Sequence, residues 1–481
     1  MLDKSYEVIS LIMRYWFIGL IILITYRVVK SAVRTNKSCS YREEGPFGHI
    51  VFFSVLLISS AFVLLAKINP DSFDRLTALI GLGIGLFMIL QYNVLRLIFP
   101  GMDRLLLIIT DVFAMLGFIM LYRFSPDTAI SQIKYFALGN VALVSFMLFT
   151  YRVHVGNKMS YVLMGLGCAL LLLPIFFGVE TFGAKNWIII RGYSLQPSEL
   201  VKIILIFVFA SQFTAKHRFS DKLPTFIFTG AAILLVVLQK DLGGALLYFY
   251  IFMFMYYIAA SDWIVVSLAG IAAVAGSIIS YRLFSHVRVR IEAWKNPWGD
   301  IENKGYQIAH SLIAISSGGL VGTGLGLGSP QIVPASKTDF IFTALCEEFG
   351  IIAGLCIIAL YAMIAIRGAT TALRSKNSYK ALLAFGATVA LTLQAFTIMG
   401  GVIKMIPLTG VTLPFISYGG SSMVVSMALI GVIEGVAMGI YEDQEEAMED
   451  YGDDSPDGIN VTKEYGLKNL DSNIGTDKEG S

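Results

Sequence analysis

The sequence predicts an all-α polytopic membrane protein with about thirteen transmembrane helices. The chain has 481 residues, of which 56% are hydrophobic and only 15% are charged, whereas a soluble domain carries roughly 25% charged residues. The apolar residues gather in blocks of about 20, the length that spans a hydrocarbon core of about 30 Å. These blocks lack the ten-residue alternation of an outer-membrane barrel, so helices are the expected spanning form.

The apolar blocks are separated by polar or charged residues, and their boundaries define the expected spans. The predicted spans run approximately over residues 8–29, 47–66, 76–98, 104–123, 133–151, 160–179, 199–215, 222–239, 241–260, 263–283, 343–366, 381–402 and 412–440. The segment from Tyr441 to Ser481 contains thirteen acids and three lysines and few large apolar residues. We therefore predict an acidic, disordered tail.

Basic residues in the short loops orient the spans, because they favour the cytoplasmic side. The first loop carries Arg34, Lys37 and Arg42, and alternation places the basic loops at 152–158, 216–222 and 367–380 on the same side. The N-terminus is then expected outside and the tail inside. The segment 180–198 and the loop 284–342 lie on the outer face, and a loop as long as the second is usually functional.

The long outer loop contains the charged stretch "EAWKNPWGDIENKGYQ" at 292–307. Its two tryptophans suit the membrane interface. Asp300 is either a functional carboxylate at headgroup level, a helix cap, or half of a surface ion pair with Lys295 or Lys304. Further on, "GGLVGTGLGLG" superficially resembles a phosphate-binding loop but has no Gly-Lys-Ser/Thr ending. We interpret it as a flexible or tightly turned loop.

Two further motifs place charges where helices meet the outer face. In "LQPSELVKI" at 195–203, Glu199 and Lys202 lie three residues apart at the start of a span. They form either a helix-surface ion pair or a buried functional pair, since charges inside a membrane usually pair or line a cavity. In "LQKDLGGAL" at 238–246, Asp241 sits in a tight link and either caps a helix or has a functional role.

Two motifs near the C-terminal end complete the polar set. "SKTDFIFTALCEEFG" at 336–350 leads into a span, which Asp339 could cap, and at least one of Glu347 and Glu348 is expected to face a polar interior. "IPLTGVTLPFISYGGSS" at 406–422 has two prolines, three glycines and several hydroxyls inside a nominal span. It predicts a broken or re-entrant helix, which is tolerated only where protein or water covers the backbone.

Together these motifs resemble the SEDS family, the FtsW, RodA and SpoVE proteins of bacterial division, elongation and sporulation. The resemblance covers about residues 104–440 and rests on "QPSELVK", "QKDLGGAL", "NPWGDIENKGYQIAHSLIAISSGGLVGTGLG", "KTDFIFTALCEEFG" and "PLTGVTLPFISYGGSS". It implies a three-helix N-terminal extension over 1–103, a ten-helix catalytic core over 104–440 and the tail over 441–481. An FtsW-like division protein is favoured, with elongation and sporulation left open.

The resemblance also implies an activity, the polymerisation of lipid II by a peptidoglycan glycosyltransferase at the outer face of the bacterial cytoplasmic membrane. The expected partners are a class B penicillin-binding protein and the divisome or elongasome; no nucleic acid is expected. Asp300 matches the catalytic acid. The residues expected to bind substrate are Glu199, Lys202, Arg191, Asp241, Lys304, Lys337, Asp339, Ser417 and Ser421.

The chemistry requires a base for the attacking hydroxyl, assigned to Asp300, and cations for the departing pyrophosphate. The candidate cations are Lys202, Arg191, Arg282, Arg288, Arg290 and Lys304. A divalent cation, Mg²⁺ or Mn²⁺, could bridge the pyrophosphate, although the sequence shows no dedicated ligand cluster; no organic cofactor is expected. A lipid II flippase and a non-catalytic scaffold for a penicillin-binding protein stay open as alternatives.

Three positions depart from the family pattern. Ile301 replaces the usual proline after the acid, Lys240 replaces the proline of the usual Gln-Pro-Asp, and Lys337 stands where a histidine is common. The departures leave the candidate acid in place, but the backbone conformation of these loops can differ from the family pattern.

Overall fold

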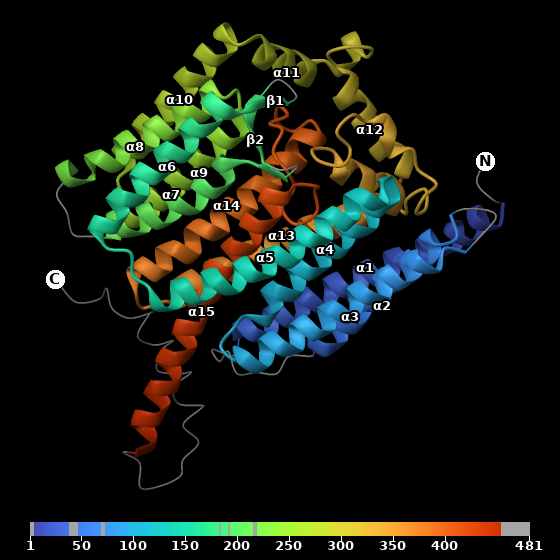
Figure 1. The fold of residues 1–481 in the computed structure, drawn as a ribbon, viewed down its shortest axis with the longest axis horizontal. Coiled ribbons are helices and arrows are strands. Elements are labelled where there is room, and N and C mark those ends of the chain that lie inside the picture. The colour runs from blue at the N-terminus through green and yellow to red at the C-terminus, as the bar shows by residue number, and fades with distance from the viewer. Residues whose placement is uncertain are drawn as a thin grey trace, which may run out of the picture.

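Long helices occupy all the predicted spans. The computed structural model describes residues 4–37, 47–68, 73–181, 184–190, 193–214 and 219–453, and Figure 1 shows them as one bundle. The long helices are α1 (Lys4–Lys37), α2 (Phe47–Leu65), α3 (Arg75–Ile98), α4 (Arg104–Phe124), α5 (Pro126–Arg152), α6 (Asn157–Phe177), α7 (Pro197–Thr214), α8 (Phe219–Leu238), α9 (Leu242–Ala260), α10 (Trp263–Leu283), α13 (Ile341–Arg374), α14 (Ser378–Val402) and α15 (Gly420–Asp453).

The length and composition of these helices agree with membrane crossing. Among the described residues, twelve helices are long and apolar enough to span a bilayer, and the stretch 222–238 of α8 is a shorter apolar helix. The predicted all-α polytopic membrane fold with about thirteen spans is confirmed. The last span is shorter than predicted at its start, because residues 404–419 are irregular and α15 begins only at Gly420.

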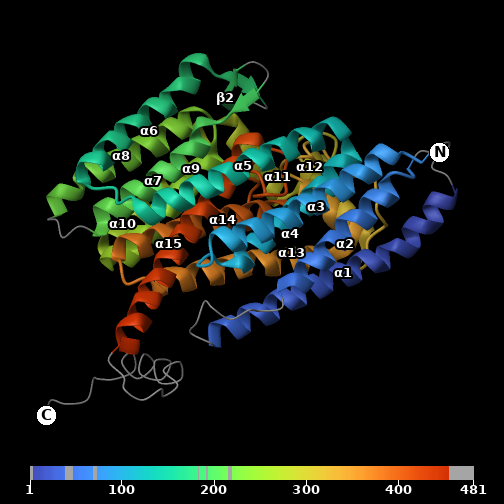
Figure 2. The same cartoon turned by 60° about the horizontal axis from the view of Figure 1, so that its bottom comes forward.

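The first three helices form a layer on one side of the bundle. Figure 2 shows α1 along α13 and α2 beside α4, and both contacts are extensive. Near its N-terminal end, α1 reaches the loop around Leu325, to which Tyr6 donates a hydrogen bond of 2.9 Å. The chain therefore enters at the end of the bundle that carries the long loop 284–342.

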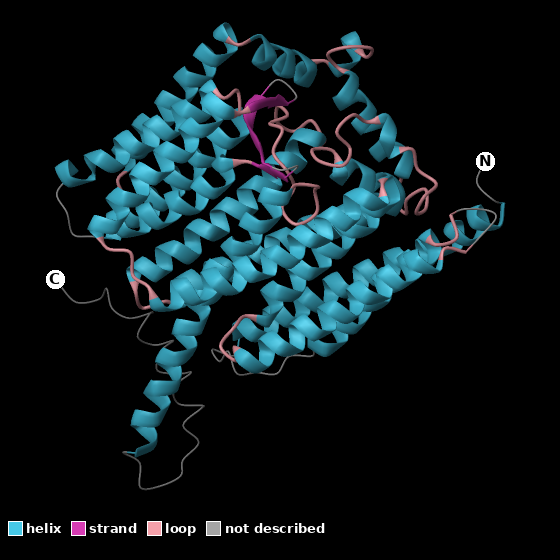
Figure 3. Ribbon diagram, viewed as in Figure 1, coloured by secondary structure: helices cyan, strands magenta, loops and turns pink. Residues whose placement is uncertain are grey.

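That end also carries structure that is not a long helix. Three short antiparallel strands follow α6, namely β1 (Val179–Thr181), β2 (Ala184–Ile190) and β3 (Tyr193–Leu195), and Figure 3 shows them beside the loops. The long loop contains α11 (Ser285–Lys295), α12 (Tyr306–Gly318) and two 3₁₀ turns, η1 (Pro297–Asp300) and η2 (Pro330–Ile332). The spacing of apolar blocks gave no sign of the small sheet, because its strands are too short to show an alternating pattern.

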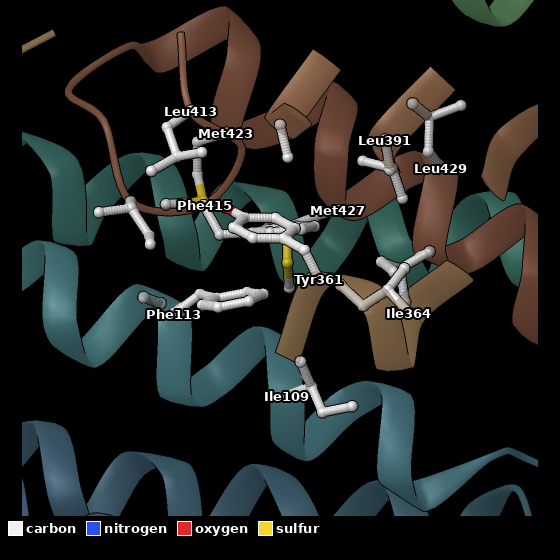
Figure 4. Packing of buried hydrophobic residues seen from close by; sticks show 14 of the residues in the cluster. Ile109, Phe113, Tyr361, Ile364, Leu391, Leu413, Phe415, Met423, Met427 and Leu429 are labelled. Atoms are coloured by element: carbon white, nitrogen blue, oxygen red, sulfur yellow. The ribbon is translucent and has the colours of Figure 1, made fainter. Parts of the chain in front are cut away.

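The helices divide into an inner and an outer set. About 94% of the apolar stretch of α4 is buried, while none of residues 263–283 in α10, all of them described, is buried. The side chains of α10 are apolar, so in a bilayer they face lipid or a ligand. At the centre, the ring of Phe113 on α4 stacks on that of Tyr361 on α13 with 4.1 Å between the ring centroids, and it lies nearly parallel to the ring of Phe415 at 6.4 Å (Figure 4).

Glycines bring α15 directly against α5. A Cβ atom at Gly431 would lie 2.2 Å from the carbonyl oxygen of Leu143, and one at Gly435 would lie 2.4 Å from that of Met147. Small residues spaced by four let two membrane helices approach at backbone distance. The sequence "GVIEGVAMG" around these positions is therefore an interhelical packing motif.

A buried ion network joins three core helices at the opposite end of the bundle from the long loop. Arg367 on α13 pairs with Asp103 at 2.6 Å, and the backbone N–H of Asp103 donates to Glu434 on α15 at 2.7 Å. All three side chains are buried. Breaking such a network would leave an uncompensated buried charge, which costs about 3–5 kcal/mol.

The acidic tail begins as helix rather than as disordered chain. Helix α15 continues to Asp453, past the boundary expected at Tyr441, and Figure 1 shows its end projecting from the bundle. The prediction of disorder is therefore wrong for residues 442–453. Composition alone did not show that an apolar helix can carry its hydrogen-bonding pattern onward into an acidic stretch. The remainder of the predicted tail lies outside the described residues.

We predict that Gly431→Ala destabilises the bundle, because the added methyl group would meet the α5 backbone, which cannot rotate away. Overpacking of this kind costs about 1–3 kcal/mol, and the apparent melting temperature in detergent should fall. The matched control is Gly165→Ala in α6, where an added Cβ meets no described atom within 4 Å. Equal melting temperatures for the two variants would contradict the packing argument.

Candidate functional site

Asp300 lies at the end of the bundle that carries the long loop, in the 3₁₀ turn η1 that follows α11. Its carboxylate accepts a hydrogen bond from the Asn303 side chain at 3.0 Å and a weak one from the Lys304 backbone at 3.5 Å. The Asn303 bond is the main cause that lowers the pKa of Asp300 below its ordinary value. The carboxylate is therefore ionised and available to ligand at neutral pH.

Lys304 does not form its ion pair with Asp300. Its ammonium group lies 2.9 Å from the Glu292 carboxylate on α11, and both side chains are about half exposed. Glu292 is the main cause that raises the pKa of Lys304, and the charge of Asp300 contributes further. The surface ion pair between Asp300 and Lys304 is therefore not observed. The hydrogen bonds of the Asp300 carboxylate are made within its own turn.

Glu199 and Lys202 form a buried pair rather than a surface one. The ammonium nitrogen and the carboxylate are 2.7 Å apart, with side-chain exposures of 3% for Lys202 and 10% for Glu199. Lys202 also donates to the side-chain oxygen of Gln394 on α14 at 2.7 Å, and Gln394 donates to the carbonyl of Thr412 at 2.9 Å. The pair therefore ties α7 to α14 and to the irregular segment 404–419.

Asp241 both caps a helix and connects separate elements. One carboxylate oxygen accepts from the backbone N–H of Gly244 at 2.8 Å, as an N-cap of α9 does. The other accepts from Asn186 on β2 at 3.0 Å and from Gln196 at 3.1 Å. This buried carboxylate holds the small sheet and the start of α7 against α9.

Asp339 and Arg290 converge on the irregular segment. A Cβ atom added to Gly410 would lie 3.2 Å from an Arg290 nitrogen and 3.5 Å from an Asp339 oxygen. Arg290 also donates to the carbonyl of Thr409 at 2.8 Å. Burial raises the pKa of Asp339 to about 6, against the opposing effects of a Thr338 hydrogen bond and of the Arg290 charge. Asp339 is thus an acid that changes charge close to neutral pH.

The electrostatic interactions show which of these charges are neighbours. The charge of Asp241 raises the pKa of Asp339. The charges of Asp241 and Glu199 both interact with the Tyr248 hydroxyl on α9. Burial, followed by the charges of Arg290 and Lys240, lowers the pKa of His286. The carboxylates Glu199, Asp241 and Asp339 are therefore within electrostatic range of one another or of a shared neighbour, and we call them the polar region; Arg290 lies beside Asp339.

Ser417, Ser421 and Lys337 hold backbone segments together. The Ser417 hydroxyl donates to the carbonyl of Thr338 at 2.5 Å and accepts from the N–H of Leu413 at 2.9 Å. Ser421 accepts from the N–H of Gln196 at 3.0 Å. The carbonyl of Lys337 accepts from the N–H of Tyr418, and its ammonium lies 3.5 Å from the Thr128 hydroxyl. The two serines are satisfied structural groups rather than free ligand contacts.

The remaining candidate cations divide by position. Arg282 and Arg288 are exposed, and Arg288 donates to the backbone carbonyl of Arg282 at 3.2 Å. Both lie at the α10–α11 corner, on the same loop as Asp300. Arg191 lies outside the described residues, so the structure says nothing of its placement.

Two departures from the family pattern have opposite structural consequences. Lys240 has φ +64° and its backbone N–H donates to Val237 at 2.9 Å. Proline, with φ near −65° and no N–H, could do neither, so this link has its own conformation. Ile301 has φ −63°, a value that proline also adopts, so the turn after Asp300 is compatible with the family pattern.

An ion pair that the sequence motifs did not predict lies beneath the glycine-rich loop. Arg123 on α4 lies 3.4 Å from Glu348 on α13 and donates to the carbonyls of Gly326 and Gly328. Glu348 accepts from the N–H of Gly326 at 3.1 Å, and Glu347 accepts from that of Ser329 at 2.8 Å. Arg123, a charged residue in the last turn of a span, is the sequence feature that could have predicted this pair.

The helix that carries both acids is interrupted directly after them, where it meets the same loop. Gly350 has φ +88°, and a Cβ atom on it would lie 2.3 Å from the carbonyl of Leu320. At Gly322, with φ +81°, a Cβ would lie 2.2 Å from the Glu348 carbonyl. Such positive φ values favour glycine. Of the two interpretations of the glycine-rich loop, the tightly turned one is correct.

The described residues contain no group of three or more His, Cys, Asp or Glu side chains arranged to hold a metal ion. The acids of the polar region instead accept hydrogen bonds from Lys, Asn, Gln and backbone donors. In the described part of the chain these acids are thus already engaged by protein donors.

Comparison with known proteins identifies relatives of the core. The family model described as "Cell cycle protein", FTSW_RODA_SPOVE, matches residues 103–441 and so leaves out α1–α3. The chain is 33% identical to peptidoglycan glycosyltransferase RodA of Mycobacterium tuberculosis, over 71% of this chain and 79% of that protein. It is also 33% identical to the probable peptidoglycan glycosyltransferase FtsW of Geobacter metallireducens, over 70% and 94%.

Solved structures share the fold. One solved structure is described as "Structural coordination of polymerization and crosslinking by a peptidoglycan synthase complex". A chain in it aligns with a TM-score of 0.59 and 24% identity, covering 71% of this chain and 98% of that one. The rod shape determining protein RodA of Thermus thermophilus aligns with a TM-score of 0.50 and 24% identity, covering 70% and 96%. With the family match over residues 103–441, these findings show that the chain belongs to the FtsW/RodA/SpoVE (SEDS) family.

Proposed function

We propose that the protein is a peptidoglycan glycosyltransferase that polymerises lipid II into glycan strands and releases undecaprenyl diphosphate. The proposal rests on family membership and on the activity in the names of the RodA and FtsW relatives. The structural observation that carries it is the position of Asp300, an ionised and partly exposed carboxylate at the end of a membrane bundle. There it can meet a sugar whose lipid carrier stays among the helices.

The reaction forms a bond between the C4 oxygen of one disaccharide and the anomeric carbon of another. The bond from that carbon to the pyrophosphate oxygen breaks, and a single displacement inverts the configuration at the carbon. Asp300 accepts the proton of the attacking hydroxyl. Its lowered pKa keeps it ionised, and the sugars that cover it would displace water and raise its proton affinity.

Cations must stabilise the charge that develops on the leaving pyrophosphate. Arg288 and Lys304 are exposed on the same loop as Asp300, and Arg290 lies at the edge of the polar region. These three are our candidates for that role. Lys202 is buried and contacts Glu199 and Gln394, so we assign it to positioning the α7–α14 contact.

The activity requires a particular placement in the cell. Lipid-linked disaccharide is polymerised outside the cytoplasmic membrane, so the end with the long loop faces outward, the N-terminus lies outside and the acidic tail lies in the cytoplasm. We also propose a class B penicillin-binding protein as the partner, in a division or elongation complex. Support comes from the related chain in a synthase that couples polymerization and crosslinking.

A divalent ion, Mg²⁺ or Mn²⁺, remains a proposal for the substrate rather than for the protein. Because the acids of the polar region accept hydrogen bonds from protein donors, in this proposal an ion would arrive on the pyrophosphate oxygens. Polymerisation by the purified protein with its partner, measured with EDTA and with added Mg²⁺ or Mn²⁺, tests this. Equal rates in all conditions would remove the ion from the account.

We predict that Asp300→Asn abolishes glycan-strand formation from purified lipid II, with a rate lower by about 10²–10⁴-fold, because the amide cannot accept the proton. The matched control is Glu302→Gln on the same loop, which should polymerise at the wild-type rate. Expression and partner binding should be unchanged in both variants, as measured by co-purification.

This assay in detergent also separates the alternatives. A flippase or a scaffold would form no polymer from purified lipid II in the wild type, because transport has no meaning in detergent. Near-normal polymer from Asp300→Asn would instead remove Asp300 as the base and leave the glycosyltransferase activity standing.

We predict that Lys202→Met destabilises the protein by about 3–5 kcal/mol, because the buried Glu199 carboxylate is then left without its ion-pair partner. The double variant Glu199→Gln/Lys202→Met should be more stable than Lys202→Met alone, since no buried charge is then left unpaired. Apparent melting temperatures in detergent test this. A double variant less stable than both single variants would argue against a charge-pair origin of the effect.

We predict that polymerisation falls as the pH is lowered through about 6, because Asp339 then becomes neutral and loses its attraction to Arg290. The sign follows from the raised pKa: Asp339 is charged at pH 7.5 and mostly protonated at pH 5. The rate of Asp339→Asn should be low and lack this step, whereas Glu302→Gln should retain it. A step that persists unchanged in Asp339→Asn would assign it to another group.

A further inference from the structure

The helix α1 contacts the glycine-rich loop of the family core although it lies outside the family match. The match begins at residue 103, while α1 spans Lys4–Lys37. The Tyr6 hydroxyl donates to the carbonyl of Leu325 at 2.9 Å, and the Ser10 hydroxyl donates to the same oxygen at 2.7 Å. Because Tyr6, Ser10 and Leu325 are all buried, this carbonyl depends on α1 for its hydrogen bonds.

The contact is too close to be incidental packing. A Cβ atom on Gly326 would lie 2.3 Å from the Tyr6 oxygen, and one on Gly324 would lie 2.9 Å from the Ser10 oxygen. Arg14 extends the contact with a weak bond to the carbonyl of Gly322 at 3.4 Å. The loop backbone thus contacts side chains of α1 over about two turns of the helix.

The core also binds the same loop. Arg123 and Glu348 bind the carbonyl and the N–H of Gly326, and the Phe17 ring of α1 packs edge-on against Phe349 at 5.8 Å. The loop is therefore held between α1 and the interruption in α13. Directly downstream along the chain, η2 leads to Lys337 and Asp339, which belong to the polar region.

We propose that α1 is a built-in clamp whose Tyr6 and Ser10 hydroxyls are positioning groups for polymerisation. By satisfying the Leu325 carbonyl, they fix the loop that links α12, just after Asp300, to the segment that carries Asp339. This inference rests on the proposed glycosyltransferase function and gives the N-terminal helix, absent from the family match, a role in that reaction. The clamp acts on the geometry of the site and does not touch the reacting atoms.

The test uses the full chain with Tyr6→Phe/Ser10→Ala, which removes both donor oxygens and leaves the apolar packing of α1 in place. Peptides covering residues 320–330 should exchange their amide hydrogens about tenfold faster, as loss of hydrogen bonds to one buried carbonyl predicts. The kcat for lipid II polymerisation should fall several-fold with KM unchanged. Tyr6→Phe/Ser10→Thr, which keeps one hydroxyl, should recover most of both effects.

The matched control is Ile12→Ala, an exposed position on the same helix (65% exposed), and it should behave as wild type. Exchange in the double variant equal to that in Ile12→Ala would overturn the clamp. Faster exchange with an unchanged kcat would overturn its positioning role. A wild type that makes no polymer would overturn the proposed function, while the exchange measurement would still decide whether α1 holds the loop. If the double variant fails to fold, Tyr6→Phe alone gives the same readouts.

Discussion

The candidate site depends on one irregular segment, residues 404–419, that is held inside a helical membrane protein. From Leu413 to Ser417 the segment is buried, so its backbone groups there must find protein partners. Phe415 supplies an apolar anchor against Phe113, and Tyr361 donates to the carbonyl of Pro414 at 2.5 Å. The anchored segment then offers carbonyls and hydroxyls to Arg290, Gln394 and Thr338.

The candidate site combines a polar region of buried charges with a partly exposed acid, Asp300, on the long loop, and the two parts have different physical roles. Glu199, Asp241 and Lys202 make short contacts to neighbouring elements, so they fix the relative positions of α7, α9 and α14. Asp300 has only turn contacts and remains accessible. An enzyme that handles a membrane-anchored substrate needs both, since a rigid frame lets one free group meet the substrate in a defined geometry.

The N-terminal helices show how an addition can become part of a core. Two hydroxyls of α1 satisfy a buried carbonyl of the core loop, and Gln91 of α3 donates to the buried Asp111 of α4 at 3.1 Å. Removing such partners would leave unsatisfied polar groups, which are costly in a low-dielectric interior. Lys240 shows a similar adaptation, with a turn that the family's proline could not adopt.

The sequence by itself determined the membrane class, the number and approximate bounds of the spans and the polar character of one end, because each follows from local composition and length. It also marked Asp300, Glu199, Lys202 and Asp339 as residues of interest. Only the tertiary structure decided which charges are buried and paired. The Arg123–Glu348 pair and the contact of Tyr6 with Leu325 join residues more than 200 positions apart. No local pattern encodes such contacts, since they arise only when separate helices pack together.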